Sequence, residues 1–192
     1  MARAIPLAAA LAVAVALIAG ARPIRQAAFP DRPPLGHTGG FGEPTCARCH
    51  AGDPLNQRGG ALTLDGLPPA YQAGGRYRLT VTMTRPRIRR SGFQLAIRFA
   101  GEDPPGRAAG TLRRIDDRVQ VADSLGVTYA FHTGVGSVLT APDRAAWALE
   151  WVAPSDSARP LVAHVAANAA NDDGSELGDF IYADSVVSQP QR

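Results

Sequence analysis

The only two cysteines of the chain stand beside a histidine in one short motif. Cys46, Cys49 and His50 belong to the sequence Cys-Ala-Arg-Cys-His. This C-x-x-C-H spacing is the attachment motif of c-type haem, because two thiols so spaced can each add to one vinyl group of the same porphyrin while the next imidazole binds the iron. The motif predicts one covalent haem c, attached at Cys46 and Cys49, with His50 as proximal iron ligand.

Two other chemistries are open to the same residues. In an oxidising compartment, Cys46 and Cys49 could form a small structural disulfide. A thioredoxin-like redox pair is disfavoured, because no βαβ pattern accompanies the motif. Cys46, Cys49 and His50 could also bind zinc with one further ligand, although the chain has no second C-x-x-C and no H-x-H pair to complete such a site. The disulfide and the metal site therefore remain as alternatives to haem.

A sixth iron ligand has four candidates along the chain. His132 ends a predicted strand beside the Gly-containing segment 133–136, and a strand-end imidazole next to a loop can reach a cofactor held by a preceding arm, so we take it as the candidate distal ligand. The alternatives are His37, in a Gly-rich stretch before the motif, and His164, within a predicted strand. Met83 is in phase with apolar neighbours and is predicted to fill the core.

Oxygen-bearing side chains gather near the C-terminus. Such a loop, over residues 171–179, could hold calcium, but it lacks the alternating acidic spacing of an EF-hand, so an ordinary polar turn is the favoured interpretation. The residues concerned are Asn168, Asn171, Asp172, Asp173, Glu176 and Asp179.

The first 21 residues have the pattern of a secretory signal peptide. Arg3 provides an early charge, an apolar run extends from Leu7 to Ile18, and residues 19–21 are small. The run is shorter than the ~20 residues that cross a bilayer, so cleavage is expected near Arg22, with no integral membrane span afterwards. The alternative is an uncleaved signal that anchors the protein. The sequence predicts an exported protein located in the periplasm, outside the cell or at the cell surface.

The rest of the chain divides into an arm, one domain and a short tail. Residues 22–60 are rich in Gly and Pro and are predicted to form an arm. Residues 61–185 contain strand-length apolar runs between turns, which predicts an antiparallel, Ig-like β-sandwich. Residues 186–192 are read as a polar tail, and residues 144–150 as a possible turn of helix. The runs are 61–65, 76–84, 92–100, 109–114, 118–122, 127–133, 146–152, 160–168 and 179–184.

Composition and missing motifs narrow the function classes. The 20 basic residues, all arginine, stand against 17 acidic ones, so the net charge is only +3 and does not indicate a nucleic-acid partner. The chain contains no G-x-S-x-G, P-loop or H-E-x-x-H motif, so we do not expect an enzyme.

A set of short segments follows a specific order along the chain: residues 38–50, 60–64, 71–81, 92–95, 132–133, 151–154, 166–171 and 178–182. This order resembles the bacterial "choice-of-anchor V" domain, which is related in pattern to the Reeler β-sandwich of extracellular proteins. The resemblance implies a secreted or surface-exposed sandwich preceded by a C-x-x-C-H loop, and it includes His132 in a His-Thr element.

Taken together, these features predict an exported monohaem c-type electron carrier whose haem is docked on a Reeler-like sandwich, with an unidentified redox partner protein. The alternative is a secreted or surface binding and adhesion module, in which the cysteine pair is a structural disulfide or part of a metal site.

Overall fold

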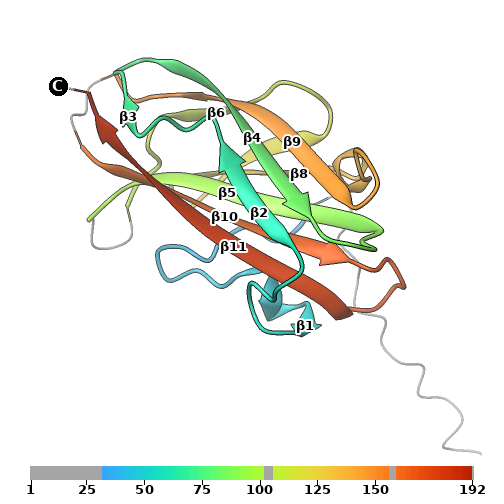
Figure 1. The fold of residues 1–192 in the computed structure, drawn as a ribbon. Coiled ribbons are helices and arrows are strands. Elements are labelled where there is room, and N and C mark those ends of the chain that lie inside the picture. The colour runs from blue at the N-terminus through green and yellow to red at the C-terminus, as the bar shows by residue number, and fades with distance from the viewer. Residues whose placement is uncertain (1–31, 102–105, 156–158, 192) are drawn as a thin grey trace, which may run out of the picture.

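Two packed β-sheets make up the body of the protein (Figure 1). The structure is a computed structural model that describes residues 32–101, 106–155 and 159–191. The predicted all-β sandwich is confirmed. The expected signal peptide lies outside the described residues.

The larger sheet has the strand order β1-β11-β10-β5-β8-β7, and β3 also pairs with β11. Its long neighbouring strands are antiparallel, whereas the two-residue strands β1 and β3 pair with β11 in parallel. The strands are β1 (Ala51–Gly52), β3 (Ala70–Tyr71), β5 (Arg90–Phe99), β7 (Val119–Ser124), β8 (Val127–His132), β10 (Leu161–Ala170) and β11 (Leu177–Pro190).

The smaller sheet has the order β2-β4-β9-β6, entirely antiparallel. Its strands are β2 (Ala61–Asp65), β4 (Arg76–Thr84), β6 (Thr111–Arg114) and β9 (Arg144–Val152). The described residues form only two helical turns, the 3₁₀ turns η1 (Cys46–Arg48) and η2 (Val135–Ser137), so this part of the chain has no helix long enough to span a membrane.

The main core lies between the two sheets. Leu79, Val81 and Met83 of β4 alternate with polar residues and are fully buried, as the period of two predicts. From the larger sheet, Phe93 packs against Trp147 of β9, with ring centroids 4.7 Å apart. Met83 therefore serves as a core residue, which confirms its predicted role.

One element type and one boundary differ from the prediction. Residues 144–150 form strand β9 and not a helical turn, because Ala145, Trp147 and Leu149 alternate inward and are fully buried. The sandwich does not end at residue 185, since β11 continues to Pro190 and pairs with β3 at Gln189. Residues 186–192 lack the alternation of a strand with one buried face, because on this part of β11 the polar Ser188 is buried and Val187 is 52% exposed.

The arm, residues 32–60, covers the outer face of the larger sheet, which is the face turned away from the smaller sheet. Figure 1 shows this blue and cyan segment beside β10 and β11. The Gln94 side chain, on the outer face of β5, donates to Pro34 O (3.0 Å) and accepts from His37 N (2.7 Å). Leu35 packs on a second apolar cluster that consists of Ala96, Val127, Tyr129 and Phe131.

A buried ion pair ties the arm to this face. The Arg98 guanidinium, only 3% exposed, contacts the Glu43 carboxylate of the arm. Tyr129 donates a hydrogen bond to Glu43 Oε1, and Thr38 donates to Oε2 at 2.6 Å. Charge-assisted hydrogen bonds of this kind are stronger than neutral ones. Because Arg98 and Glu43 neutralise each other inside the interface, neither is easily separated from the other.

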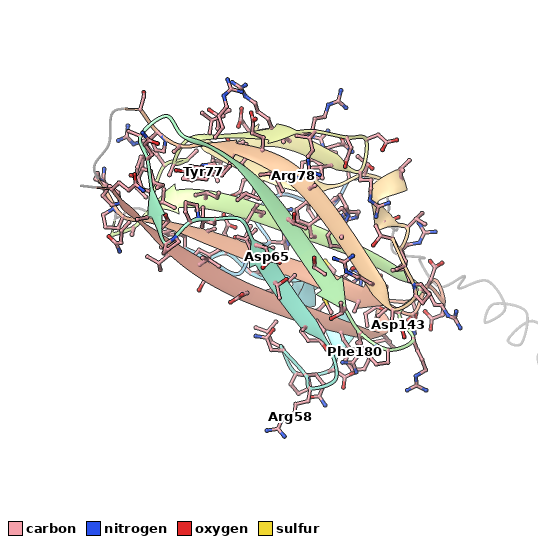
Figure 2. The ribbon with its side chains drawn as sticks, turned by 45° about the horizontal axis from the view of Figure 1, so that its top comes forward. Arg58, Asp65, Tyr77, Arg78, Asp143 and Phe180 are labelled. Carbon is pink, nitrogen blue, oxygen red and sulfur yellow. The ribbon has the colours of Figure 1, made fainter. Side chains whose placement is uncertain are left out.

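One end of the sandwich is closed by the arginine-rich hairpin between β4 and β5. Figure 2 places Arg58, Asp143 and Phe180 together at this end, far from Tyr77. The Arg85 guanidinium lies over the Phe180 ring, 3.2 Å from its centroid, and donates to Arg58 O. Its backbone N–H donates to Asp143 O at 3.0 Å. This hairpin therefore joins both sheets and the arm.

We predict that Glu43→Gln releases the arm. Removing one partner of a buried ion pair leaves the other charge uncompensated and costs on the order of 3 kcal/mol, so trypsin should cut after Arg48 about 100-fold faster. Glu150→Gln is the control, because the Glu150 pair with Arg76 is exposed and such pairs contribute less than about 1 kcal/mol. Equal cleavage rates in the two variants would contradict the docking role of Glu43.

Candidate functional site

The C-x-x-C-H motif forms a compact turn on the outer face. The Cys46 carbonyl accepts hydrogen bonds from both Cys49 N (3.2 Å) and His50 N (3.0 Å). The Thr45 hydroxyl caps η1 by accepting from Ala47 N at 3.2 Å. The next two residues form β1, which pairs with β11. His50 therefore leaves the turn beside the first residues of β11.

The His50 imidazole is tied to the sheet by a carboxylate. Its Nδ1 lies 2.7 Å from Asp179 Oδ2, and the Asp179 side chain is 2% exposed while that of His50 is 32% exposed. Asp179 Oδ1 accepts from Asn171 N at 3.1 Å. Because an ionised carboxylate only accepts hydrogen bonds, the Nδ1–H of His50 is the donor.

Asn168 completes the surroundings of His50. Its Nδ2 lies 3.1 Å from Nδ1 and 3.3 Å from Nε2 of His50, and 3.4 Å from Asp179 Oδ2. Its Oδ1 is buried without a hydrogen-bond partner. The amide thus packs against the imidazole with one polar atom left unsatisfied.

The His132 ring reaches Gly92 of β5, although strand alternation turns His132 away from Phe131 of the outer cluster. Gly92 of β5 pairs directly with Asn168, and directly paired residues point to the same side of a sheet. A Cβ built on Gly92 would come within 2.4 Å of His132 Cε1, so the ring occupies the space above this glycine. Its Nδ1 is 3.1 Å from Phe93 N and 3.3 Å from Phe93 O. The ring of the predicted distal ligand therefore lies by Gly92 of β5, the strand that pairs with β10 at Asn168.

The two alternative histidines lie on the outer face but farther along it. His164 is four residues before Asn168 on β10, which is about 13 Å along a strand. The arm covers it, since Phe41 packs edge-on at 5.0 Å between ring centroids. His37 stays within the arm, where its Nδ1 lies 3.2 Å from Leu35 O. Neither residue contacts His50.

The two thiols have different surroundings. Cys46 is partly buried and Cys49 is exposed, and neither is bonded to another cysteine. Burial raises the pKa of the Cys46 thiol to about 12, and the neighbouring Cys49 adds to this. A thiol with so high a pKa is a poor nucleophile at neutral pH. Cys49 is the more accessible of the two thiols.

The acidic segment 171–179 uses its side chains within the fold. Asp173 accepts from Asn171 Nδ2 and from Ser175 N, and Asp172 pairs with Arg90 at 3.0 Å. Among the residues that the structure describes, no three His, Cys, Asp or Glu side chains gather into a metal site.

Sequence reasoning missed Asp179 and Asn168 as partners of His50. Both belonged to the predicted polar turn, and nothing local connects them to a histidine more than a hundred positions earlier. The Glu43 and Arg98 pair was also missed. The only available hint was an arginine within the apolar strand pattern of residues 92–100.

Comparisons with known proteins concern the fold. Neither a family model nor a curated protein matches the chain. It is similar to the Reeler domain of human F-spondin, at 20% identity over 71% of this chain and 93% of that one, with a TM-score of 0.45. A second crystal structure of that domain covers 76% and 97%, at 20% identity and a TM-score of 0.46. A cohesin module of a Clostridium perfringens family 33 glycoside hydrolase is 12% identical over 69% of this chain and 96% of the module, with a TM-score of 0.46.

The environment of His164 predicts a loss of stability in acid. Burial lowers the pKa of its imidazole, and the positive charge of Arg98 lowers it further. Below the ordinary histidine pKa of about 6.5, the unfolded chain binds a proton that the folded chain resists, so the free energy of unfolding falls as the pH falls. Urea unfolding at pH 7.5 and 5.5 should show a larger decrease for the parent than for His164→Gln. An equal decrease in both proteins would contradict the prediction.

Proposed function

We propose that the protein is an exported electron carrier with one haem c. The haem would be attached at Cys46 and Cys49, ligated by His50, and docked on the outer face of the larger sheet beside β10 and β11. When bound, the iron would accept or release one electron. The protein residues would hold it, orient its ligands and leave one haem edge open to a redox partner.

The observation that carries the proposal is the anchored His50. Histidines that bind metals usually donate their other ring N–H to a carboxylate or carbonyl, which fixes the ring and its tautomer. The Nδ1 contact with Asp179 would fix the His50 ring and its tautomer in this way, and it leaves Nε2 as the nitrogen for iron. If iron takes Nε2, the Asn168 amide still has Asp179 Oδ2 as an acceptor. The donor set of two unbonded thiols and one oriented imidazole fits a c-type haem.

The position of His132 supports a second iron ligand. Its ring lies over Gly92, and Gly92 is the direct partner of Asn168. The His132 Nδ1 accepts from Phe93 N at 3.1 Å, which leaves the proton of the neutral ring on Nε2. Iron could bind Nε2 only if this proton left that nitrogen. His50, which comes just before β1, and His132, at the end of β8, could then approach the iron from its two sides.

The surface near His50 provides apolar area for a porphyrin. Leu177 is 64% exposed and lies two residues before Asp179 on β11. Leu55 is 47% exposed, and the neighbouring Asn56 hydrogen-bonds to Ala183 of β11 through both amide atoms. A porphyrin laid on this edge would bury apolar area on one side, which is favourable, and remain accessible on the other.

The first test is the absorption spectrum of the full chain, exported from a host with haem-attachment machinery. We expect a Soret band that survives denaturation and acid–acetone extraction, because thioether bonds are covalent. Cys46→Ala with Cys49→Ala should abolish the band yet still unfold cooperatively, since the core residues follow Gly60. A colourless parent protein from such a host would overturn the proposal and favour a surface binding or adhesion module.

The second test concerns the sixth ligand. With His50 and His132 both bound, the ferrous iron should be low-spin and should resist carbon monoxide. His132→Ala should make the iron high-spin and allow carbon monoxide to bind. His37→Ala and His164→Ala are the matched controls, and both should keep the parent spectrum. If one of them loses the low-spin spectrum while His132→Ala keeps it, the assignment of His132 is wrong.

A further inference from the structure

We propose that Asp179 is a positioning residue for His50 that sets its tautomer and lowers the reduction potential of the iron. The tautomer part concerns the protein alone, whereas the part on the potential rests on the proposed haem function. The experiments below separate the two.

Both oxygens of the Asp179 carboxylate are already engaged. Oδ2 accepts from His50 Nδ1 at 2.7 Å, and Oδ1 accepts from Asn171 N at 3.1 Å. With its side chain 2% exposed, the carboxylate has almost no contact with water. Its orientation is therefore fixed by two hydrogen bonds, and the short distance to Nδ1 is typical of a charge-assisted bond.

Paired strands carry the two side chains. Asp179 lies on β11, one residue before Phe180, where the antiparallel ladder with β10 ends, and β10 is in turn paired with β5. Gly52, two residues after His50, pairs directly with Asp179. Imidazole and carboxylate are thus attached to neighbouring backbone positions, which is the arrangement that holds a functional side chain within a narrow range of geometry.

The negative charge of Asp179 acts on His50 without a salt bridge to an arginine. In the described part of the chain, the groups in contact with the carboxylate are the imidazole of His50, the side-chain amide of Asn168 and the backbone N–H of Asn171. None of these carries a permanent positive charge. In a buried setting such a charge acts more strongly than in water.

The effect on the potential follows from charge. A bound haem would take one electron from a reduced partner protein, with ferric iron reduced to ferrous iron, no bond broken and no proton needed. The oxidised site carries one more positive charge, so a nearby carboxylate stabilises it more than it stabilises the reduced site. Hydrogen bonding to Asp179 also makes the imidazole a stronger electron donor at Nε2. Both effects favour the oxidised form and lower the potential.

The first experiment uses the full chain without haem and with reduced thiols. Nitrogen-15 NMR of the histidine side chains, with the His50 signals identified by their loss in His50→Gln, should show the proton on Nδ1. Asp179→Ala should lose this preference, while Asp184→Ala should retain it, because Asp184 lies on the same strand but is exposed. A His50 proton on Nε2 in the parent protein would overturn the positioning role, and this result does not depend on haem.

The second experiment measures the reduction potential of the haem-loaded protein. Asp179→Asn removes the charge and keeps the shape, so at a fixed ambient potential we expect at least a tenfold increase in the ratio of reduced to oxidised protein, equivalent to about 59 mV. Asp184→Asn removes the same charge on the same strand and should change the ratio less than twofold. Equal shifts in the two variants, or none in Asp179→Asn, would overturn the inference even though haem is bound.

The two experiments distinguish failure of the proposed function from failure of this inference. If the parent protein takes up no haem, the electron-carrier proposal fails, and the NMR result alone decides whether Asp179 orients His50. Cooperative unfolding monitored by circular dichroism checks that each variant is folded. Should Asp179→Asn not fold, Asp179→Glu provides the test, because it keeps the charge and should keep the potential within twofold of the parent ratio; a larger change would overturn the inference.

Discussion

The buried contact between Glu43 and Arg98 determines where the arm can lie. Arg98 points away from the main core of the sandwich, onto a face that would be open to water without the arm. The residue is only 3% exposed. A buried guanidinium without a carboxylate is strongly unfavourable, and the carboxylate comes from the arm. Tyr129, Thr38 and the Leu35 contacts then complete a continuous interface. The Cys-x-x-Cys-His turn follows directly and is therefore set against the same sheet.

Strand register determines which side chains the turn meets there. Because β10 lies between β5 and β11 in regular antiparallel pairing, Asn168 is flanked by Gly92 on one side and Ile181 on the other. Side chains of this row share one face, so His50, arriving from the arm, lies beside Asn168 and Asp179. Gly92 leaves space that the His132 ring fills. The larger sheet thus sets an oriented imidazole, that of His50, on its outer face, which is why we propose haem docking at this place.

Local chemistry carries much of the information about this protein in its sequence. The spacing of Cys46, Cys49 and His50 can be recognised in the sequence, because all three residues lie within five consecutive positions. Alternation of apolar and polar residues predicted β2 and β4 at their observed bounds, and placed Leu79, Val81 and Met83 in the core. Burial of one sheet face produces that pattern directly.

Tertiary structure decided what alternation leaves open. Tyr129 and Phe131 alternate with the same period as core residues, yet they belong to the outer cluster beneath the arm. Alternation alone does not show that the arm packs on this face as a second layer and buries these side chains. The end of β11 lacks a strand pattern in the sequence, because there the polar Ser188 is buried and Val187 is exposed. Asp179 became the partner of His50 through the pairing of β1 with β11, more than a hundred residues apart in the chain. The amino-acid sequence by itself determined the alternating strands and the Cys-x-x-Cys-His motif, because both depend on neighbouring residues. Contacts between distant segments, set by strand order and register, decided what surrounds the motif.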